Sequence, residues 1–460
     1  MKPLVVFFVF VWVALGEIGL LRGAELRVGV FRQDATPPVG APLAYDTMTW
    51  VDQTLSARGI VLLGAGQPIV LCSVDWIGIG NGAQDSWKRG IAEAIGTIPE
   101  RVAIHTVHQH DAPSCDFTAL ALLQAHGVTD LPFDPVFARR TIADVADAVR
   151  RSVANARPLT HLGVGQATVE RIASNRRILG EDGKVSVTRW TATRDPNVQA
   201  QPVGQIDPMI KLVSFWEEDT PLAVLSYYAT HPQSHYRTGG ANPDFPGLAR
   251  SMRESETGGV PHIHFNGAGG DIGAGKWNDG SPENRVALAV RLADGARRAW
   301  ESTERAPISI EDVHWRTLPV ALPRSNALDL KALEAILANE TQPMIDRREA
   351  AYHLAWAQRV QSGETIPVGR LRLNEVDILH LPGEAVISYQ LEAQALAPDR
   401  FVAVAAYGDY GPGYICRAPQ YLQGGYEASA RASRVAAHAE TVLLPIIEAL
   451  LSENPSDSAP

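Results

Sequence analysis

The sequence predicts an α/β layered fold, in which a mixed or mostly parallel sheet is flanked by helices. Short apolar runs rich in β-branched residues alternate with longer segments at helical spacing, a pattern typical of such layers. Each apolar run leads at once into a loop rich in Gly, Pro and polar side chains. Loops at the carboxyl ends of strands converge over one sheet edge, so we expect the functional site at that edge.

Six of the apolar runs are predicted to be strands, because they are short and bounded by turn residues. They comprise residues 70–74, 102–107, 222–229, 262–265, 376–381 and 401–406. The loops that follow them are rich in His, Asp, Glu and Tyr, from Asp75 after the first run to Tyr414 after the last.

Segments with helical periodicity lie between the strands. The expected helices comprise residues 85–95, 136–154, 284–302, 385–396 and 429–451, and Asp134-Pro135 is a start signal for the second. Near residues 325–363 we expect a helical insertion on the sheet, built from two helices with an acidic and basic surface pattern. No internal repeat is evident in the sequence.

The chain has 460 residues without a linker-like or low-complexity stretch, so residues 25–452 are predicted to form one large catalytic domain. Hydrophobic residues make up 45% and charged residues 20%, which is ordinary globular composition. The net charge of −10 is spread along the chain with no Lys- and Arg-rich run. A nucleic-acid-binding protein would show a basic footprint, so no nucleic-acid partner is expected.

The first residues have the features of a signal peptide. Lys2 supplies a positive charge before an unbroken apolar run from Leu4 to Leu15, which is too short to span a bilayer. A buried amino-terminal strand is the alternative explanation of this run. We expect residues 1–24 to be removed on export to the periplasm or the exterior, a mature protein without a transmembrane segment, and a disordered tail at 453–460.

A candidate metal site begins at His108-Gln109-His110, which places two imidazoles on one face of an extended segment. Imidazole suits Zn²⁺, and a catalytic zinc commonly has three protein ligands and one water. Alone, such a pair is more often hydrogen-bonded in a core. His231 and Glu384 also follow strand-like runs and can meet the pair across the sheet edge, which favours a metal site. Glu384 also fits a second role, because an acidic residue in a first helical turn stabilises the helix dipole.

Several other catalytic motifs are excluded by spacing or absence. The stretch from Gly267 to Gly273 follows a strand, but its third glycine comes one residue too late for a dinucleotide-binding GxGxxG loop. It predicts a tight turn, and its small side-chain bulk would also let a substrate approach the backbone. The chain has no GxSxG, HExxH or GxxxxGK[ST] motif, so it lacks the usual sequence motifs of serine hydrolases, zincins and P-loop proteins.

Three segments carry a resemblance to a known family: His108-Gln109-His110-Asp111-Ala112-Pro113, Tyr228-Ala229-Thr230-His231 and Pro382-Gly383-Glu384. From about residue 27 to about residue 451 the chain resembles the neutral, or neutral/alkaline, ceramidases, zinc amidases that hydrolyse N-acylsphingosine to a fatty acid and a sphingoid base. The resemblance implies metal ligands at His108, His231 and Glu384. It also implies an acid/base or substrate-contacting histidine at His110.

Further segments add site residues to this resemblance. The spacing of Tyr414, Tyr421 and Tyr426 resembles the closing segment of the family, which implies that Tyr414 reaches the metal and Tyr426 lies in the active site. Asn175-Arg176 resembles a pair whose arginine lines the same pocket. Core packing of the tyrosines and a surface position for Arg176 are the alternatives.

Substrate contacts are expected at Asn266, Gly267 and Asp271. The family shows Gln-Ser-Asn before Gly-Asp or Gly-Asn, where this chain has Asn266-Gly267-Ala268 before Gly270-Asp271. Gly267 therefore replaces a serine, and we expect this change to alter the wall of the pocket.

The resemblance implies one Zn²⁺ per chain and hydrolysis of an amide bond through a metal-activated water. The substrate would be a small-molecule or lipid amide of the ceramide kind, and peripheral contact with a membrane is compatible with it. One alternative is a metallo-esterase or phosphoesterase that uses Asp75, Asp244 or Asp271 with the histidines in a two-metal site. Another is an exported binding protein with a vestigial zinc site.

The chain has three cysteines, too few for a disulfide framework. Cys72 lies inside an apolar run and is predicted to be buried. Cys115 and Cys416 each lie a few residues beyond a proposed site residue, His110 and Tyr414, so their loops are expected to be neighbours. An exported protein meets oxidising conditions, and we therefore predict a disulfide between Cys115 and Cys416.

Overall fold

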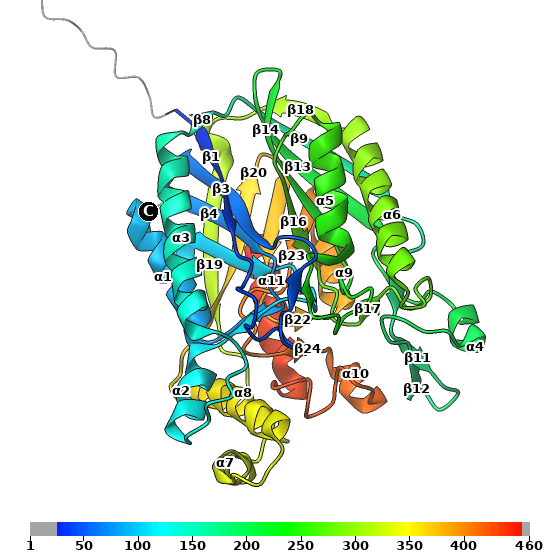
Figure 1. Ribbon diagram of the computed structural model, residues 1–460. Helices are drawn as coiled ribbons and strands as arrows, with labels where there is room; N and C mark the ends of the chain where they lie inside the picture. The colour runs from blue at the N-terminus through cyan, green and yellow to red at the C-terminus, as the bar shows by residue number, and fades with distance from the viewer. Residues whose placement is uncertain (1–24, 453–460) are drawn as a thin grey trace, which may run out of the picture.

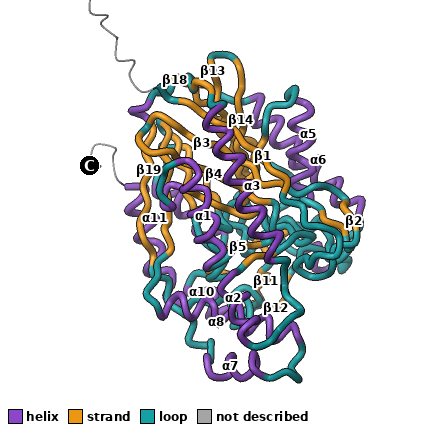
Figure 2. Tube along the Cα trace, turned by 60° about the vertical axis from the view of Figure 1, so that its left-hand side comes forward, coloured by secondary structure: helices purple, strands orange, loops and turns teal. Residues whose placement is uncertain are grey.

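The computed structural model describes residues 25–452, so the predicted signal peptide and the predicted tail lie outside the described residues. The predicted α/β class is confirmed. Three large mixed sheets contain the long strands of the described chain, and helices cover their outer faces (Figures 1 and 2). None of the helices within residues 25–452 is both long and apolar enough to cross a bilayer.

The first sheet has five strands in the order β6-β4-β3-β1-β8. Strands β1, β3 and β4 are antiparallel neighbours, and β6 is added parallel to β4. Helices α1 and α3 pack on its outer side, where Figure 2 shows them in front of the strands. The bounds are β1 (Arg27–Asp34), β3 (Ser56–Gly64), β4 (Gly66–Val74), α1 (Gly82–Ile95), β6 (Val102–Thr106), α3 (Pro135–Ala154) and β8 (Arg157–Pro158).

The second sheet also has five strands, in the order β16-β14-β13-β9-β18. Strands β9, β13 and β14 are antiparallel neighbours, and β16 is parallel to β14. Helices α5 and α6 pack on this sheet. The bounds are β9 (His161–Thr168), β13 (Met209–Glu217), β14 (Thr220–Tyr228), α5 (Asp244–Glu256), β16 (His262–Asn266), α6 (Pro282–Glu301) and β18 (Glu304–Pro307).

The third sheet has four strands in the order β19-β20-β21-β23. Strands β19, β20 and β21 are antiparallel neighbours, and β23 is parallel to β21. Helices α9 and α11 pack against it. The bounds are β19 (Val313–Val320), β20 (Ile366–Leu373), β21 (Val376–His380), α9 (Ile387–Leu396), β23 (Phe401–Ala405) and α11 (Glu440–Ser452).

The three sheets repeat one topology that the sequence does not reveal. In each sheet an antiparallel hairpin, β3-β4, β13-β14 or β20-β21, is followed by a helix and by a strand parallel to the second strand of the hairpin. The loops after β4, β14 and β21 are therefore equivalent, and they carry Asp75, His231 and Glu384. Two of the predicted metal ligands thus occupy matching places in two sheets.

One apolar core is shared by all three sheets and brings their carboxyl edges together. It contains Leu71 of β4, Leu225 of β14 and Ile378 of β21, none of them exposed to solvent. Three further clusters fill the space between each sheet and its helices. The shared core therefore holds loops that are distant in sequence over one edge of the molecule.

Short elements gather beyond this edge. Figure 1 shows β22, β24, α10 and the insertion helices α7 and α8 together at the lower end of the molecule. The predicted insertion near 325–363 is thus confirmed as two helices. The bounds are β2 (Trp50–Val51), β5 (Gly78–Ile79), η1 (Pro99–Arg101), β7 (Ser114–Cys115), α2 (Phe117–Ala125), β10 (Ser174–Asn175), β11 (Arg177–Leu179), β12 (Val185–Thr188), α4 (Pro196–Ala200), β15 (Gly240–Ala241), β17 (Ile272–Gly273), η2 (Ile310–Asp312), α7 (Leu330–Ala338), α8 (Met344–Gln361), β22 (Glu384–Ala385), β24 (Tyr414–Ile415), α10 (Ala418–Gln423) and η3 (Ala437–Ala439).

Two helix predictions are wrong at their starts. The helix expected from residue 385 begins at Ile387, because Glu384 and Ala385 pair with β24 in the short strand β22. The helix expected from residue 429 begins at Glu440. The backbone before it bonds to distant segments instead, with Tyr414 N donating to Ala432 O at 3.1 Å and Ala436 N donating to Pro323 O at 2.9 Å.

The predicted disulfide is also wrong. Cys115 and Cys416 are both free and buried, and they belong to different apolar clusters. Cys115 packs between the first sheet and its helices, whereas Cys416 packs between the third sheet and its helices. Proximity of each cysteine to the site along the chain therefore does not place the two sulfurs together. Cys72 is buried in the first of these clusters, as predicted.

Buried histidines outside the site predict a loss of stability in mild acid. Burial, and then nearby arginines, lower the pKa of His262 to about 3 and of His264 and His353 to about 4, from an ordinary value of 6.5. The unfolded chain therefore takes up these protons first as the pH falls below 6.5. Three such groups lower the free energy of unfolding by up to about 4 kcal/mol per pH unit near pH 5.

Urea unfolding at pH 7 and pH 5 measures this effect, and the His262→Gln variant isolates one group. Between these two pH values we expect the variant to reduce the loss of unfolding free energy by about 2 kcal/mol, because one proton contributes at most about 1.4 kcal/mol per pH unit and only below pH 6.5. His438→Gln is the matched control, because His438 is exposed. An equal loss in wild type and His262→Gln would contradict the assignment.

Candidate metal centre

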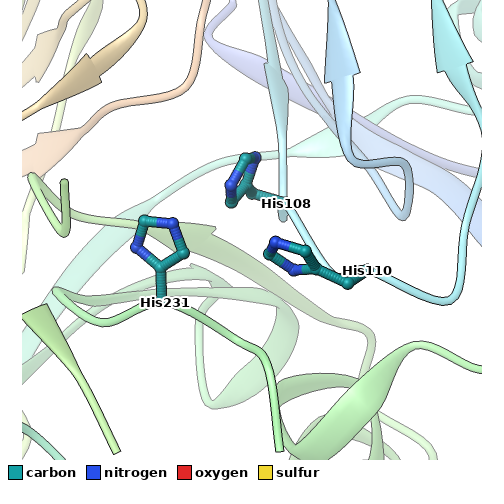
Figure 3. Close-up of side chains that lie close together, drawn as sticks. All are labelled: His108, His110 and His231. Atoms are coloured by element: carbon teal, nitrogen blue, oxygen red, sulfur yellow. The ribbon is translucent and has the colours of Figure 1, made fainter. Parts of the chain in front are cut away.

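Three histidines meet at the carboxyl edge of the sheets. The ring nitrogens of His108, His110 and His231 lie within 4.8 Å of one another, and all three residues are buried. Figure 3 shows the rings facing one another, two from the loop after β6 and one from the loop after β14. Within residues 25–452 they form the one such group of three or more candidate metal-binding residues found among His, Cys, Asp and Glu.

The backbone fixes the orientation of His108. Its Nδ1 lies 2.6 Å from Ile77 O, and its φ of 70° is in the left-handed region that few residues with a Cβ adopt. Asn266 Nδ2 donates to Val107 O at 2.6 Å and holds the preceding peptide. Because a carbonyl oxygen only accepts, Nδ1 carries the proton, and the lone pair of Nε2 points away from the backbone.

His231 is held in the same way. Its Nδ1 lies 2.8 Å from Gly269 O, so its Nε2 also presents a lone pair. Its own backbone N–H donates to Ile272 O at 3.0 Å, which ties the loop after β14 to the glycine-rich stretch. The glycine-rich stretch therefore serves as the support of a histidine.

Glu384 joins the two imidazoles. Its Oε2 lies 3.3 Å from His108 Nε2 and 3.1 Å from His231 Nε2, and the side chain is 1% exposed. Its Oε1 accepts a hydrogen bond from Tyr410 Oη at 2.7 Å. Oε2 accepts no hydrogen bond from any described residue. Two imidazole nitrogens and one carboxylate oxygen therefore meet in a buried space.

This arrangement fits a metal ion. Ligands about 2.0–2.2 Å from a tetrahedral zinc are about 3.3–3.5 Å from one another, close to the separations observed here. Two imidazole nitrogens and one carboxylate oxygen are a common set for catalytic zinc. Tyr414 Oη, 3.1 Å from His231 Nε2, lies beside them as a fourth candidate ligand atom. The structure thus brings together all four residues predicted as ligands.

The electrostatics agree with a site for a cation. Burial alone would raise the pKa of Glu384, but His108 and His231 hold it well below its ordinary value. Burial lowers the pKa of His231, and it lowers that of His110 well below the ordinary value, with His108 next in effect. A carboxylate beside neutral imidazoles is the form in which these groups bind metals.

His110 differs from the other two histidines in its contacts. Its Nδ1 is buried without a hydrogen-bond partner in the described chain. Its ring stacks on Tyr45 at 5.5 Å and contacts Tyr236 at 5.6 Å between centroids. No hydrogen bond or ion pair links it to the carboxylate of Glu384 in the described chain, and its ring faces the exposed Tyr45.

Arg176 is buried beside Tyr414 and Tyr426. Its Nη1 donates to Tyr414 Oη at 3.2 Å, and its guanidinium lies 5.5 Å from the ring centroid of Tyr426. Burial alone would lower the pKa of Arg176, but Tyr414 and Glu427 hold it above its ordinary value. The guanidinium therefore stays charged beside the tyrosine that faces His231.

Comparison with known proteins places this site in a known architecture. No family model and no curated protein matches the chain. A ceramidase complexed with C2 superposes with a TM-score of 0.66 over 93% of this chain and 75% of its own, at 15% identity. The neutral ceramidase from Pseudomonas aeruginosa gives a TM-score of 0.65 over 93% of this chain and 74% of its own, also at 15% identity.

The chain has the neutral ceramidase fold. The resemblance predicted from the motifs is thus confirmed for the fold, over nearly all of the described chain. At 15% identity the two solved structures leave the substrate and the reaction of this chain open. The function is therefore inferred from the site residues of this chain.

Within this ceramidase fold, the three expected substrate contacts are bonded to the scaffold. Asn266 holds the peptide before His108, as described above. A Cβ on Gly267 would lie 2.4 Å from Gln390 Oε1, so a serine here would require the Gln390 side chain to shift. Asp271 Oδ1 accepts from Ile387 N at 2.8 Å at the start of α9. Direct contact of these residues with a substrate stays a prediction.

The three aspartates of the two-metal alternative are also engaged elsewhere. Asp75 accepts two hydrogen bonds from Arg250, at 2.9 and 2.7 Å. Asp244 Oδ2 accepts from Ser234 N at 3.0 Å. None of the aspartates belongs to the candidate metal group found in the described chain, which favours a single ion.

Sequence reasoning missed several tyrosines at the site. Tyr407 stacks on His108 at 4.6 Å, and Tyr410 donates to Glu384. Both belong to the tyrosine-rich loop after β23, whose first tyrosines were not singled out. Tyr45 lies far upstream in a loop without any motif, so no signal in the sequence connects it with His110.

The Tyr410→Phe variant tests the candidate metal site through a hydrogen bond to Glu384. Loss of the donor to Glu384 Oε1 should weaken metal binding by about 10–100-fold, the range for outer-sphere partners. Zinc affinity, measured by competition with a chromophoric chelator, gives the readout. Tyr227→Phe is the matched control, because the buried Tyr227 hydroxyl has no partner in the described chain. Equal affinities of the Tyr410→Phe variant and wild type would contradict the role.

Proposed function

We propose that this protein is a zinc-dependent hydrolase of a linear amide bond, with one Zn²⁺ held by His108, His231, Glu384 and Tyr414. The observation that supports it most strongly is the meeting of two Nε2 lone pairs and Glu384 Oε2 at 3.1–3.3 Å in a buried space. A buried carboxylate is paired or coordinates a metal, and this one faces two nitrogens of the kind that bind zinc. The ceramidase fold makes amide hydrolysis the reaction class to test first.

A Zn²⁺ ion bound by these residues would supply a Lewis acid and a water whose pKa lies near neutrality. His110 accepts the proton of the attacking water and returns it to the leaving nitrogen. A neutral imidazole suits the first step. Arg176 and Tyr426 donate hydrogen bonds to the oxyanion that forms on the carbonyl oxygen.

For the substrate we propose an N-acylated amine, either a small molecule or a lipid of the ceramide kind. Tyr45 and Tyr236 lie beside His110, and their aromatic rings favour a substrate with apolar parts. We also propose export of the protein, on the basis of the signal-peptide pattern in residues 1–24, and peripheral contact with lipid during catalysis.

Metal analysis combined with a substrate screen tests the proposal. Purified protein should contain one zinc per chain and should hydrolyse at least one member of a panel of N-acyl amides of varied chain length. A chelator should abolish the activity, and added zinc should restore it. Phosphate-ester turnover with two metals per chain would instead support a phosphoesterase. Stoichiometric zinc without turnover of any amide or ester would support a binding protein.

A further inference from the structure

A cavity lies beside the metal centre, against the insertion helix α8. Its volume is about 160 Å³, and it is bounded by α8 and by the loops after β4, β7 and β23. Apolar and aromatic side chains make up much of its wall, among them Tyr45, Ile77, Ile345, Tyr352 and Tyr410.

The cavity shares its wall with the metal centre. Ile77 O lies 2.6 Å from His108 Nδ1, and Tyr410 Oη donates to Glu384 at 2.7 Å. Tyr45, on the third side, stacks on His110. Three lining residues therefore each contact one residue of the metal centre, so the cavity adjoins the metal centre.

The charged residues of the cavity already have partners. Arg348 Nη2 lies 2.7 Å from Asp130, and Glu349 is paired with Arg431. Arg434 Nη1 donates to Gly411 O at 2.9 Å. With these charges neutralised or bonded, the remaining wall suits an apolar group better than an ion.

We propose that this cavity binds the apolar chain of the amide substrate, and that α8 sets the length of chain that is bound. The proposal rests on the proposed function. An apolar cavity of about 150 Å³ holds a benzene ring, so this one has room for about six carbon atoms. A longer chain would pass Ile345, which is 55% exposed at the start of α8, and would leave the protein.

Two substrate series test the proposal and identify the chain concerned. One varies the acyl chain at a fixed amine, and the other varies the amine chain at a fixed acyl group. In one series kcat/KM should rise about fourfold per methylene, which corresponds to about 0.8 kcal/mol per buried CH₂, and should level off near six carbons. Ile345→Trp narrows the mouth and should flatten the rise, whereas Tyr352→Ala enlarges the cavity and should extend it.

The matched control is Val286→Trp, because Val286 on α6 is 52% exposed and lies outside the cavity. Thermal unfolding of each variant verifies its folding, and the exposed position of Ile345 makes Ile345→Trp informative even if Tyr352→Ala does not fold. A change of chain-length profile in either series supports the proposal. Unchanged profiles in both series for Ile345→Trp would overturn it.

Calorimetric titration with octanoate and with octylamine separates this proposal from the proposed function. Ile345→Trp should weaken binding of one of the two at least tenfold relative to Val286→Trp. If the wild type hydrolyses no amide but shows this effect, the proposed function fails and the cavity remains a site for apolar chains. If amides are hydrolysed but neither ligand distinguishes the two variants, the cavity proposal fails alone.

Discussion

The Glu384→Gln variant should lose both its zinc and its activity. The substitution keeps the size of the side chain but removes the negative charge that faces two imidazole lone pairs at 3.1 and 3.3 Å. We expect kcat/KM to fall by at least about 1,000-fold, beyond the 10–100-fold typical of outer-sphere partners. Zinc content after gel filtration and amide hydrolysis are the measurements.

The exposed Glu340 provides the control, because Glu340→Gln makes the same chemical change in the helical insertion, away from the site. Far-ultraviolet circular dichroism establishes that both variants are folded. A Glu384→Gln protein that keeps one zinc per chain with near wild-type activity would contradict the role of this carboxylate.

Replacement of His110 should separate catalysis from metal binding. The ring of His110 stacks on Tyr45 and forms no hydrogen bond or ion pair with Glu384 in the described chain, whereas His108 Nε2 lies 3.3 Å from that carboxylate. His110→Gln should therefore retain one zinc per chain while turnover falls by about 10²–10⁴-fold, the usual contribution of general acid–base catalysis. His108→Gln should lose the zinc.

Zinc stoichiometry and kcat of both variants, with His438→Gln as an exposed control, decide between the two roles. The close approach of the three histidine rings makes this comparison necessary, because one nitrogen from each ring could together bind a metal. Loss of zinc from His110→Gln to the same degree as from His108→Gln would show that His110 is a metal ligand. It would refute the assignment of His110 to acid–base catalysis alone.

The strands could be predicted from the sequence because each is a short apolar run that ends at a polar loop. The predicted run 222–229 corresponds to β14 (Thr220–Tyr228), and the run 376–381 corresponds to β21 (Val376–His380). Residue patterns report burial over a few neighbours, and that is sufficient to identify such strands. They do not report which strand lies beside which. The threefold repeat of topology stayed hidden for this reason.

The site could be predicted only in part. His108, His231 and Glu384 were found because their motifs resemble known ones, and the shared core then brings them together. Their supports are long-range backbone contacts, such as Gly269 O to His231 Nδ1, that no local pattern encodes. The same limit explains the disulfide prediction, since nearness to a site along the chain does not say into which cluster the side chain of Cys416 packs.

The position of a bound zinc ion tests the central claim most directly. Crystals grown with zinc should give a single strong anomalous difference peak at the zinc absorption edge, within bonding distance of His108 Nε2, His231 Nε2 and Glu384 Oε2. Bond lengths of about 2.0–2.2 Å are expected for these ligands. A well-ordered crystal with no peak at this cluster, or with its strongest peak elsewhere, would contradict the account.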